Sequence, residues 1–236
     1  GHHALLRRPT AIKVLPVDGP LVDRAAIERF EREVRVTSQL THPNTIAVYD
    51  YGRSPRGIFY YAMEYLDGPD LAALVTRVGP LPAARVVHLL RGVVGSLAEA
   101  HAAGLVHRDV KPANIIVCSR GGIADFVKVL DFGLVRSIAK EAAPDKSEGI
   151  AGTPLYMAPE ALLSPDEIRP SVDVYAVGAV AYFLLTGRAP LDGESMTELF
   201  AKVLTVVPDP PSLSSPHHVP AVLDELILRC LAKEPK

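Results

Sequence analysis

The chain has 236 residues, of which 48% are hydrophobic and 22% charged, with 25 basic and 27 acidic side chains and a net charge of -2. This length suffices for one large domain or two small lobes around a buried core, and the composition excludes an intrinsically disordered chain. The near-neutral balance provides no basic field that would favour nucleic acid or anionic lipid, so neither is expected as a partner.

The cysteine content and the hydropathy bear on location. Cys118 and Cys230 lie in apolar contexts and are interpreted as buried free thiols in a reducing compartment, because a metal site would need further ligands nearby. The most apolar run, residues 174–185, is shorter than the ~20 residues that a membrane span needs. No signal peptide is recognisable. A cytoplasmic location is expected, and a membrane anchor outside this stretch stays open.

The first predicted element is a strand at residues 10–15, where side chains alternate in character. In this pattern Lys13 faces opposite to Ile12 and Val14. A lone lysine on an edge strand is usually a solvated side chain, so the sequence that follows decides its interpretation.

A helix is predicted to begin at Asp23, a good N-cap, and to end near Leu40. Its buried face is marked by apolar residues at helical spacing, namely Ile27, Phe30 and Val34. Glu33 borders this face, whereas Glu28 and Glu31 project farther from it. A solvated helix charge is the alternative interpretation of Glu33.

Two further strands are predicted at residues 46–51 and 58–66, separated by the turn formers Gly52, Pro55 and Gly57. The second strand runs into residues 63–68, Met-Glu-Tyr-Leu-Asp-Gly. Asp70 follows at a position that suits the N-cap of a helix.

A long amphipathic helix is predicted from Pro82 to Ala102, with Gly104 as a natural C-cap. It leads to the octapeptide 107–114, His-Arg-Asp-Val-Lys-Pro-Ala-Asn, and to the strand-like run 115–117. An acid, an ammonium group and an amide are thereby fixed in one short loop. A carboxylate can accept a hydroxyl proton, a lysine can meet a γ-phosphate and an asparagine oxygen can hold Mg²⁺, so this set suits phosphoryl transfer.

Two motifs follow this loop. Residues 131–133 are Asp-Phe-Gly, which offers a second metal carboxylate, and residues 152–160 are Gly-Thr-Pro-Leu-Tyr-Met-Ala-Pro-Glu. Before the first, the polar, Gly-rich residues 119–125 predict a surface turn. Between the motifs, residues 135–150 form a mixed-charge loop in which Ser147 is the best candidate for phosphorylation, with an unmodified serine as an equal alternative.

The last third of the chain predicts helices. Residues 174–185 are apolar on all sides, as in a helix inside a core, and Asp173 stands at its head. Residues 195–198, Ser-Met-Thr-Glu, form a capping box that opens a helix to about Leu204. Pro220 at the first helical position begins the last helix, whose expected buried residues are Leu223, Leu226, Ile227 and Cys230.

Together the motifs at residues 10–13, 107–114, 131–133 and 152–160 resemble the eukaryotic-type (Hanks-type) protein kinases over nearly the whole chain, and Lys-Pro-x-Asn with Gly-Thr-Pro is similar to the Ser/Thr branch. The resemblance implies a Ser/Thr kinase that transfers the γ-phosphoryl group of Mg-ATP to hydroxyls of protein substrates in signalling. It implies an α+β, bilobal fold, with a small antiparallel-sheet lobe and hinge over residues 1–66 and a mainly helical lobe over residues 67–236. The amino-acid composition, rich in alanine, proline and arginine, hints at a bacterial source.

The resemblance also implies roles at the reacting end of ATP. Asp109 would be the base, Lys111 would steady the γ-phosphate, and Asn114 and Asp131 would bind the metal ions. Lys13 would hold the α- and β-phosphates, and Glu33 would pair with it.

The adenine and regulatory sites follow from the same resemblance. The implied adenine contacts are Ala11 as roof, Ile116 as floor, Met63 as gatekeeper and the backbone of Glu64 and Leu66, with Asp70 either at the ribose or serving only as a helix N-cap. Implied regulatory or structural roles fall on Arg108 as a receptor for an activation-loop phosphate, Thr153 as a contact to Asp109 and Lys111, Asp173 as an N-cap or holder of loop amides, and His107 and Phe132 as packing residues.

The chain departs from the family pattern at both ends. No Gly-x-Gly-x-x-Gly precedes Lys13, and the sequence stops before the arginine that the family usually pairs with the position of Glu160. We therefore expect a partial kinase domain that is weakly active alone. Two alternatives stay open. A pseudokinase-like binding module would be expected to lack Lys13, Asp109 or Asp131, and a small-molecule kinase seldom carries residues like 153–160.

Overall fold

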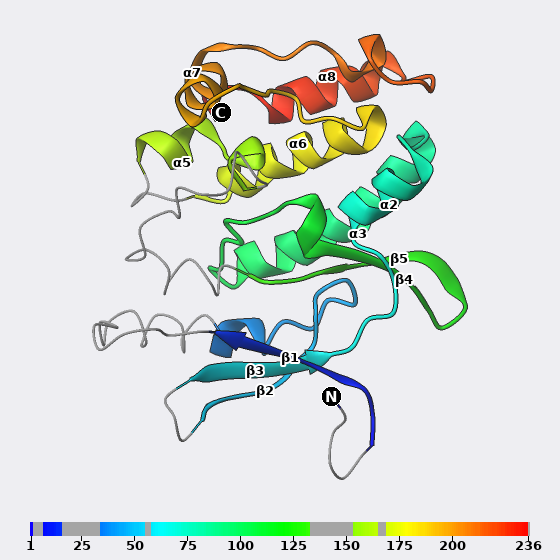
Figure 1. Cartoon of the computed structure of the whole chain (residues 1–236), viewed down its shortest axis with the longest axis vertical. Coiled ribbons are helices and arrows are strands. Elements are labelled where there is room, and N and C mark those ends of the chain that lie inside the picture. Colours follow the sequence, from blue (N-terminus) through cyan, green and yellow to red (C-terminus); the bar gives the residue numbers. More distant parts are fainter. Residues whose placement is uncertain (2–6, 16–33, 55–57, 133–152, 165–168, 236) are drawn as a thin grey trace.

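The computed structural model describes residues 1, 7–15, 34–54, 58–132, 153–164 and 169–235. These residues form a small sheet at one end and a larger, mostly helical part at the other (Figure 1). Most of the helix predicted from Asp23 lies outside the described residues. Its end is seen as helical residues 34–37, with Val34 fully buried as expected.

The sheet has three antiparallel strands in the order β1-β3-β2. They are β1 (Thr10–Leu15), β2 (Val48–Arg53) and β3 (Phe59–Glu64), so the first strand is placed as predicted and the other two are shorter or shifted by about two residues. The inner face of β3 carries the buried Phe59 and Tyr61. Ile12 and Val14 on β1 are exposed, at 57% and 54%.

The helical part is built around α6 (Ser171–Thr186), which is apolar on all sides and buried along most of its length, as its sequence predicts. It ends at Gly187, whose left-handed φ of 77° lets its amide return to the carbonyl of Phe183. The surrounding elements are α2 (Leu71–Val78), α3 (Ala83–Ala102), α5 (Pro159–Leu163), α7 (Met196–Thr205) and α8 (Ala221–Cys230), with short 3₁₀ turns at Pro112–Asn114, Thr153–Tyr156 and Pro211–Leu213.

A hairpin of β4 (Ile115–Arg120) and β5 (Ile123–Val129) lies between the sheet and the helices (Figure 1). Its tight turn is Gly121-Gly122, with φ of 57° and 80°, so the predicted polar turn at 119–125 is narrower than expected. The segment before β2 binds this hairpin, because the Ile46 amide donates to the Val129 carbonyl and the Val129 amide to the Asn44 carbonyl. The hairpin is thereby tied to the sheet.

Two expectations for the C-terminal region need correction. Leu226 is 56% exposed rather than buried, since it lines an open apolar groove beside α3 and α6. Pro220 is the N-cap of α8 and not its first helical residue. Cys118 and Cys230 are free thiols as expected, although both are only partly buried. No helix in the described ranges has the length and apolar character that a membrane crossing requires.

Candidate active site

The loop 107–114 brings together the three groups that its sequence singles out. The carboxylate Oδ2 of Asp109 lies 2.9 Å from the Lys111 Nζ and accepts a hydrogen bond of 2.9 Å from the Asn114 amide nitrogen. The same nitrogen donates to the backbone carbonyl of Asp109 at 2.8 Å, and Asn114 is buried. An acid, a cation and an amide therefore converge, which is the arrangement that phosphoryl transfer to a hydroxyl requires.

Asp173, in the first turn of α6, holds this loop. Its two carboxylate oxygens accept 2.8 Å hydrogen bonds from the backbone amides of His107 and Arg108, and its side chain is 1% exposed. His101 at the end of α3 contacts the same carboxylate at 2.8 Å. The N-cap of α6 is Pro170, so the alternative of Asp173 as an N-cap is wrong and the role of holding loop amides is confirmed.

His107 and Phe132 are packing residues, as expected. Their ring centroids are 4.7 Å apart, and His107 is fully buried while its Nε2 donates to the Leu130 carbonyl at 2.7 Å. Burial lowers the pKa of His107, against the charges of nearby carboxylates. The Leu130 amide in turn donates to the Asn114 carbonyl at 2.9 Å, which places residue 131 beside the loop.

Asp131 has a left-handed backbone, with φ of 54°, and two donors reach its carboxylate. The Lys13 Nζ lies 2.6 Å from Oδ2, and the Tyr61 hydroxyl donates to Oδ1 at 2.5 Å. The predicted lysine and the predicted metal ligand thus meet. Tyr61 was not predicted, although it lies two residues before Met63 and so on the same face of β3.

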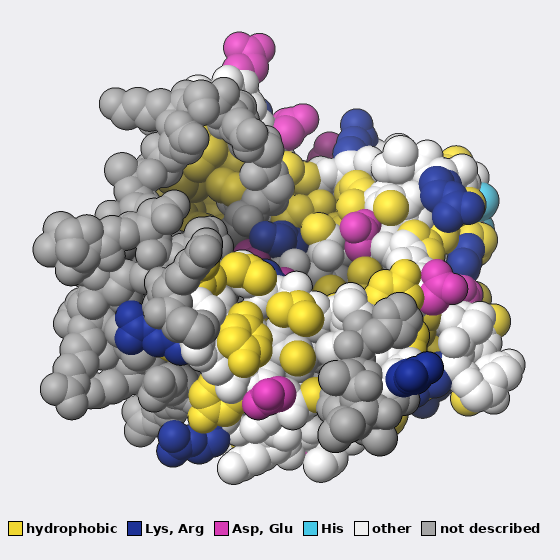
Figure 2. Space-filling view, turned by 60° about the horizontal axis from the view of Figure 1, so that its bottom comes forward, with side chains coloured by type: hydrophobic (Ala, Val, Ile, Leu, Met, Phe, Trp, Pro, Cys, Tyr) yellow, Lys and Arg dark blue, Asp and Glu magenta, His cyan; other side chains and the backbone are white. Residues whose placement is uncertain are grey.

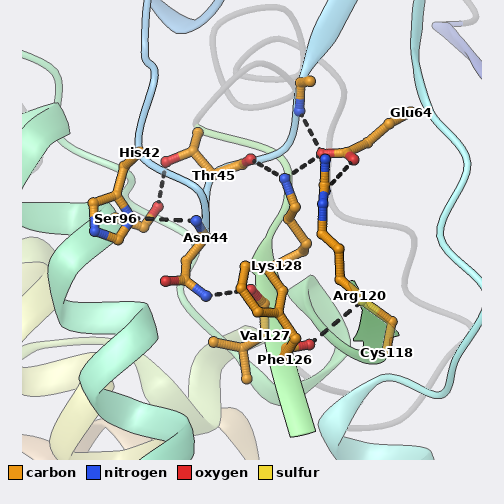
Figure 3. Close-up of polar contacts among 11 residues, drawn as sticks. His42, Asn44, Thr45, Glu64, Ser96, Cys118, Arg120, Phe126, Val127 and Lys128 are labelled. Carbon is orange, nitrogen blue, oxygen red and sulfur yellow. Dashed lines mark hydrogen bonds and ion pairs between the residues drawn. The ribbon is translucent and has the colours of Figure 1, made fainter. Parts of the chain in front are cut away.

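A buried ion-pair network lies behind the strand end at Glu64 (Figure 3). The Glu64 carboxylate lies 2.5 Å from the Lys128 Nζ and 2.7 Å from the Arg120 Nη1, and it accepts from the Ala47 amide at 2.9 Å. Lys128 also donates to the Thr45 carbonyl at 2.8 Å. The network joins β3, β4 and β5. Sequence reasoning singled out only the backbone of Glu64, because a lysine between two valines predicts a solvent-facing side chain, whereas the end of β5 is buried on both faces.

The predicted adenine residues are neighbours in pairs. Ala11 lies opposite Met63 in the β1–β3 ladder, and Ile116 lies opposite Asp70 in an isolated bridge. The Asp70 carboxylate accepts from the Ala73 amide at 2.7 Å and caps α2, which confirms the N-cap interpretation. Its ribose contact stays a prediction, as do the contacts of Leu66.

Some predicted residues cannot be placed in this geometry. Glu33 and Ser147 lie outside the described residues, and so does the side chain of Thr153, whose backbone begins a 3₁₀ turn. Arg108 is exposed on the loop, with a φ of 67°. The described surface is hollowed, and basic, acidic and hydrophobic side chains gather in the hollow (Figure 2).

The residues present suit a magnesium–nucleotide better than a bare metal ion. The described part of the chain holds no cluster of three His, Cys, Asp or Glu side chains for a metal. The amide nitrogen of Asn114 is held by Asp109, so the amide oxygen is the atom that would bind a metal ion. One amide oxygen and the Asp131 carboxylate form a small set of hard oxygen donors, and Mg²⁺ is usually bound through such a set together with substrate phosphates and water.

Comparisons with known proteins agree with this geometry. The family model described as "Protein kinase domain" matches residues 1–236. The chain is 40% identical over 219 residues to Serine/threonine-protein kinase pkn3 of Myxococcus xanthus, covering 91% of this chain and 40% of that protein. It is 40% identical to Pkn1 of the same organism, over 100% of this chain and 33% of that protein, and 35% identical to PknB of Mycobacterium leprae, over 98% and 36%. The chain therefore spans well under half the length of these relatives.

Proposed function

Since the chain belongs to the protein kinase domain family, with relatives named as serine/threonine-protein kinases, we propose that its protein transfers the γ-phosphoryl group of ATP to serine and threonine hydroxyls of proteins. The observation that carries this proposal is the convergence of Asp109, Lys111 and Asn114 in one loop, together with the Lys13–Asp131 pair beside it. Division into a sheet lobe over residues 1–66 and a helical lobe over residues 67–236 is part of the proposal.

In the proposed reaction, Asp109 orients the substrate hydroxyl and accepts its proton as the oxygen attacks the γ-phosphorus. Lys111 lies 2.9 Å from this carboxylate, so its ammonium group is close enough to balance charge on the transferred group. Asn114 also donates to Asp109 and so limits rotation of the base. Mg²⁺ held by Asn114 and Asp131 would neutralise charge on the β- and γ-phosphates.

At the other end of the nucleotide, Lys13 holds the α- and β-phosphates and Glu33 pairs with it. Adenine lies between Ala11 and Ile116, next to Met63, and bonds the backbone of Glu64 and Leu66. The Glu64 side chain supports this assignment, because its ion pairs with the buried Lys128 and the half-exposed Arg120 fix the strand end whose backbone would meet the base. Asp70 contacts the ribose while it caps α2.

Regulation is proposed for the segment outside the described residues. Phosphorylated Ser147 would pair with Arg108, since a guanidinium group binds phosphate through two parallel hydrogen bonds. Thr153 would contact Asp109 and Lys111 and shape the site for the substrate hydroxyl. The catalytic part is proposed to act in the cytoplasm.

The test is to incubate the protein expressed from its whole reading frame with Mg-ATP and a generic basic protein, and to analyse the product for phosphoserine and phosphothreonine. We expect both phosphoamino acids. Retained ATP binding without any transfer would instead indicate a pseudokinase-like binding module.

A further inference from the structure

Tyr61 and Lys13 reach the same carboxylate from adjacent strands. They lie directly opposite each other in the β1–β3 ladder, so their side chains project from the same face of the sheet. Lys13 contacts Oδ2 of Asp131 at 2.6 Å, and the Tyr61 hydroxyl donates to Oδ1 at 2.5 Å. Each oxygen of the carboxylate thus has its own donor from the sheet.

The Tyr61 hydroxyl is a fixed, permanent donor. Tyr61 is 1% exposed, and a buried phenol that loses its hydrogen-bond partner is destabilised. A phenol has an ordinary pKa of about 10, so its hydroxyl carries a proton to donate at neutral pH. Lys13 is 31% exposed at its side chain. It is the donor that an arriving phosphate can draw away.

A hydrogen bond from Tyr61 does not block metal binding by Asp131. A carboxylate oxygen has two lone pairs, so Oδ1 can accept from the phenol and Oδ2 is left with at least one lone pair beside Lys13. The side chain of Asp131 is 16% exposed, and the backbone before it is held by the hydrogen bond from the Leu130 amide to the Asn114 carbonyl. Without the phenol, Lys13 would be the one described side chain that donates to this carboxylate and opposes its rotation about the side-chain bonds.

We propose that Tyr61 is a positioning residue for the reaction: its hydroxyl sets the orientation of the Asp131 carboxylate and so strengthens binding of the metal–nucleotide. This inference rests on the proposed function, because it assumes that Asp131 is a metal ligand. Partners that orient a metal ligand from behind typically contribute about 10–100-fold to metal affinity or activity.

The variant that tests this is Tyr61→Phe, which keeps the ring and its packing and removes only the hydroxyl. Tyr60→Phe is the matched control, since Tyr60 is the next residue on β3 and points to the other face of the sheet. All measurements use the protein expressed from its whole reading frame. Binding of Mn²⁺ is followed by electron paramagnetic resonance in the presence of a non-hydrolysable ATP analogue, and Mg²⁺ dependence of turnover is measured beside it.

We expect Tyr61→Phe to raise the half-saturating concentration of Mn²⁺ by about 10–100-fold, with affinity for the metal-free analogue unchanged and Tyr60→Phe like wild type. An unchanged Mn²⁺ titration, even with a lowered melting temperature, would overturn the proposal and leave Tyr61 a packing residue. A lower metal requirement would also overturn it, because the phenol would then obstruct the ligand.

The two proposals fail in different ways. If wild type binds Mn²⁺ with the analogue but transfers no phosphate, only the proposed function falls, and the Tyr61 comparison still decides this inference. If wild type binds no Mn²⁺ with the analogue, Asp131 is not a metal ligand and the role of Tyr61 is refuted.

Discussion

Lys128 Nζ and Glu64 Oε1 lie 2.5 Å apart, and their side chains are only 3% and 8% exposed, so this ion pair fastens β5 to the end of β3 in nearly complete absence of water. Figure 3 shows the two side chains pointing at each other, with the Thr45 carbonyl on the lysine and Arg120 on the carboxylate. Removal of Lys128 leaves the buried Glu64 charge with only the half-exposed Arg120 as a cationic partner.

Lys128→Met should therefore lower the free energy of unfolding by at most about 3–5 kcal/mol, measured by urea denaturation. Lys202→Met is the control, because Lys202 forms its pair with Glu198 at the surface, and we expect no measurable change there. Adding Glu64→Leu to Lys128→Met should restore part of the loss. A Lys128→Met protein as stable as the Lys202→Met protein would show that the pair is not buried in solution.

The same carboxylate predicts a dependence of stability on pH. Burial alone would raise the pKa of Glu64, but hydrogen bonds from Lys128 and the Ala47 amide outweigh it and hold the pKa below the usual 4.5. The unfolded chain therefore takes up this proton at higher pH than the folded protein, so the contribution of Glu64 is complete above about pH 4.5 and is lost as the pH falls through the folded-state pKa. Glu64→Gln should flatten the fall in the free energy of unfolding below about pH 4.5. Equal slopes for both proteins would contradict this.

A partly exposed pair should behave differently. The Arg85 guanidinium on α3 forms two hydrogen bonds of 2.8 Å to the Asp125 carboxylate near the start of β5, and both side chains are about one-third exposed. Arg85→Met should lower the free energy of unfolding by only ~0.2–1 kcal/mol, and the difference should shrink as salt is added. A salt-independent loss would mean that packing of the arginine stem, and not its charge, is responsible.

Asp109→Asn should lower turnover by about 10²–10⁴-fold, because the amide cannot accept the hydroxyl proton. The fold should be kept, since the amide oxygen can still accept from Lys111 or Asn114. Single-turnover phosphate transfer is the measurement, with nucleotide affinity as the parallel readout and exposed Asp67→Asn as the control. Turnover near the wild-type rate would show that Asp109 is not the base.

Asp173→Asn should loosen the loop 107–114. Both carboxylate oxygens accept hydrogen bonds from backbone amides. An asparagine side chain would have to point its NH₂ group, a donor, at one of these backbone N–H groups. We expect a loss of about 1.5–3 kcal/mol in the free energy of unfolding, the range of one hydrogen bond to a charged group, together with slower turnover. Asp224→Asn is the control: Asp224 accepts one exposed hydrogen bond from the Ser212 amide, which the asparagine oxygen can still accept, so neither quantity should change. Wild-type stability and turnover in Asp173→Asn would refute the anchoring role.

Local sequence predicts the parts of this molecule whose structure is decided locally. The octapeptide 107–114 predicts the convergence around Asp109, and the all-apolar run at 174–185 predicts the central helix α6. Tyr61 and Lys128 escaped prediction because their roles depend on which element covers which face of a strand. Leu226 shows the same limit from the other side, since an apolar stripe predicts a face and not the neighbour that buries it.

The attachment of Asp131 at two ends has a mechanical consequence. The backbone next to Asp131 is connected to the loop 107–114 by the Leu130–Asn114 hydrogen bond, and Asp173 attaches that loop to α6. The Asp131 side chain, in contrast, is held by Lys13 and Tyr61 of the sheet. If the sheet tilts away from α6, either the Asp131 carboxylate must rotate with the sheet or its hydrogen bonds to Lys13 and Tyr61 must break. Opening of the sheet away from the helices would therefore also change the orientation of the carboxylate that is proposed to bind the metal ion, so the proposed metal site would be complete only in the closed arrangement.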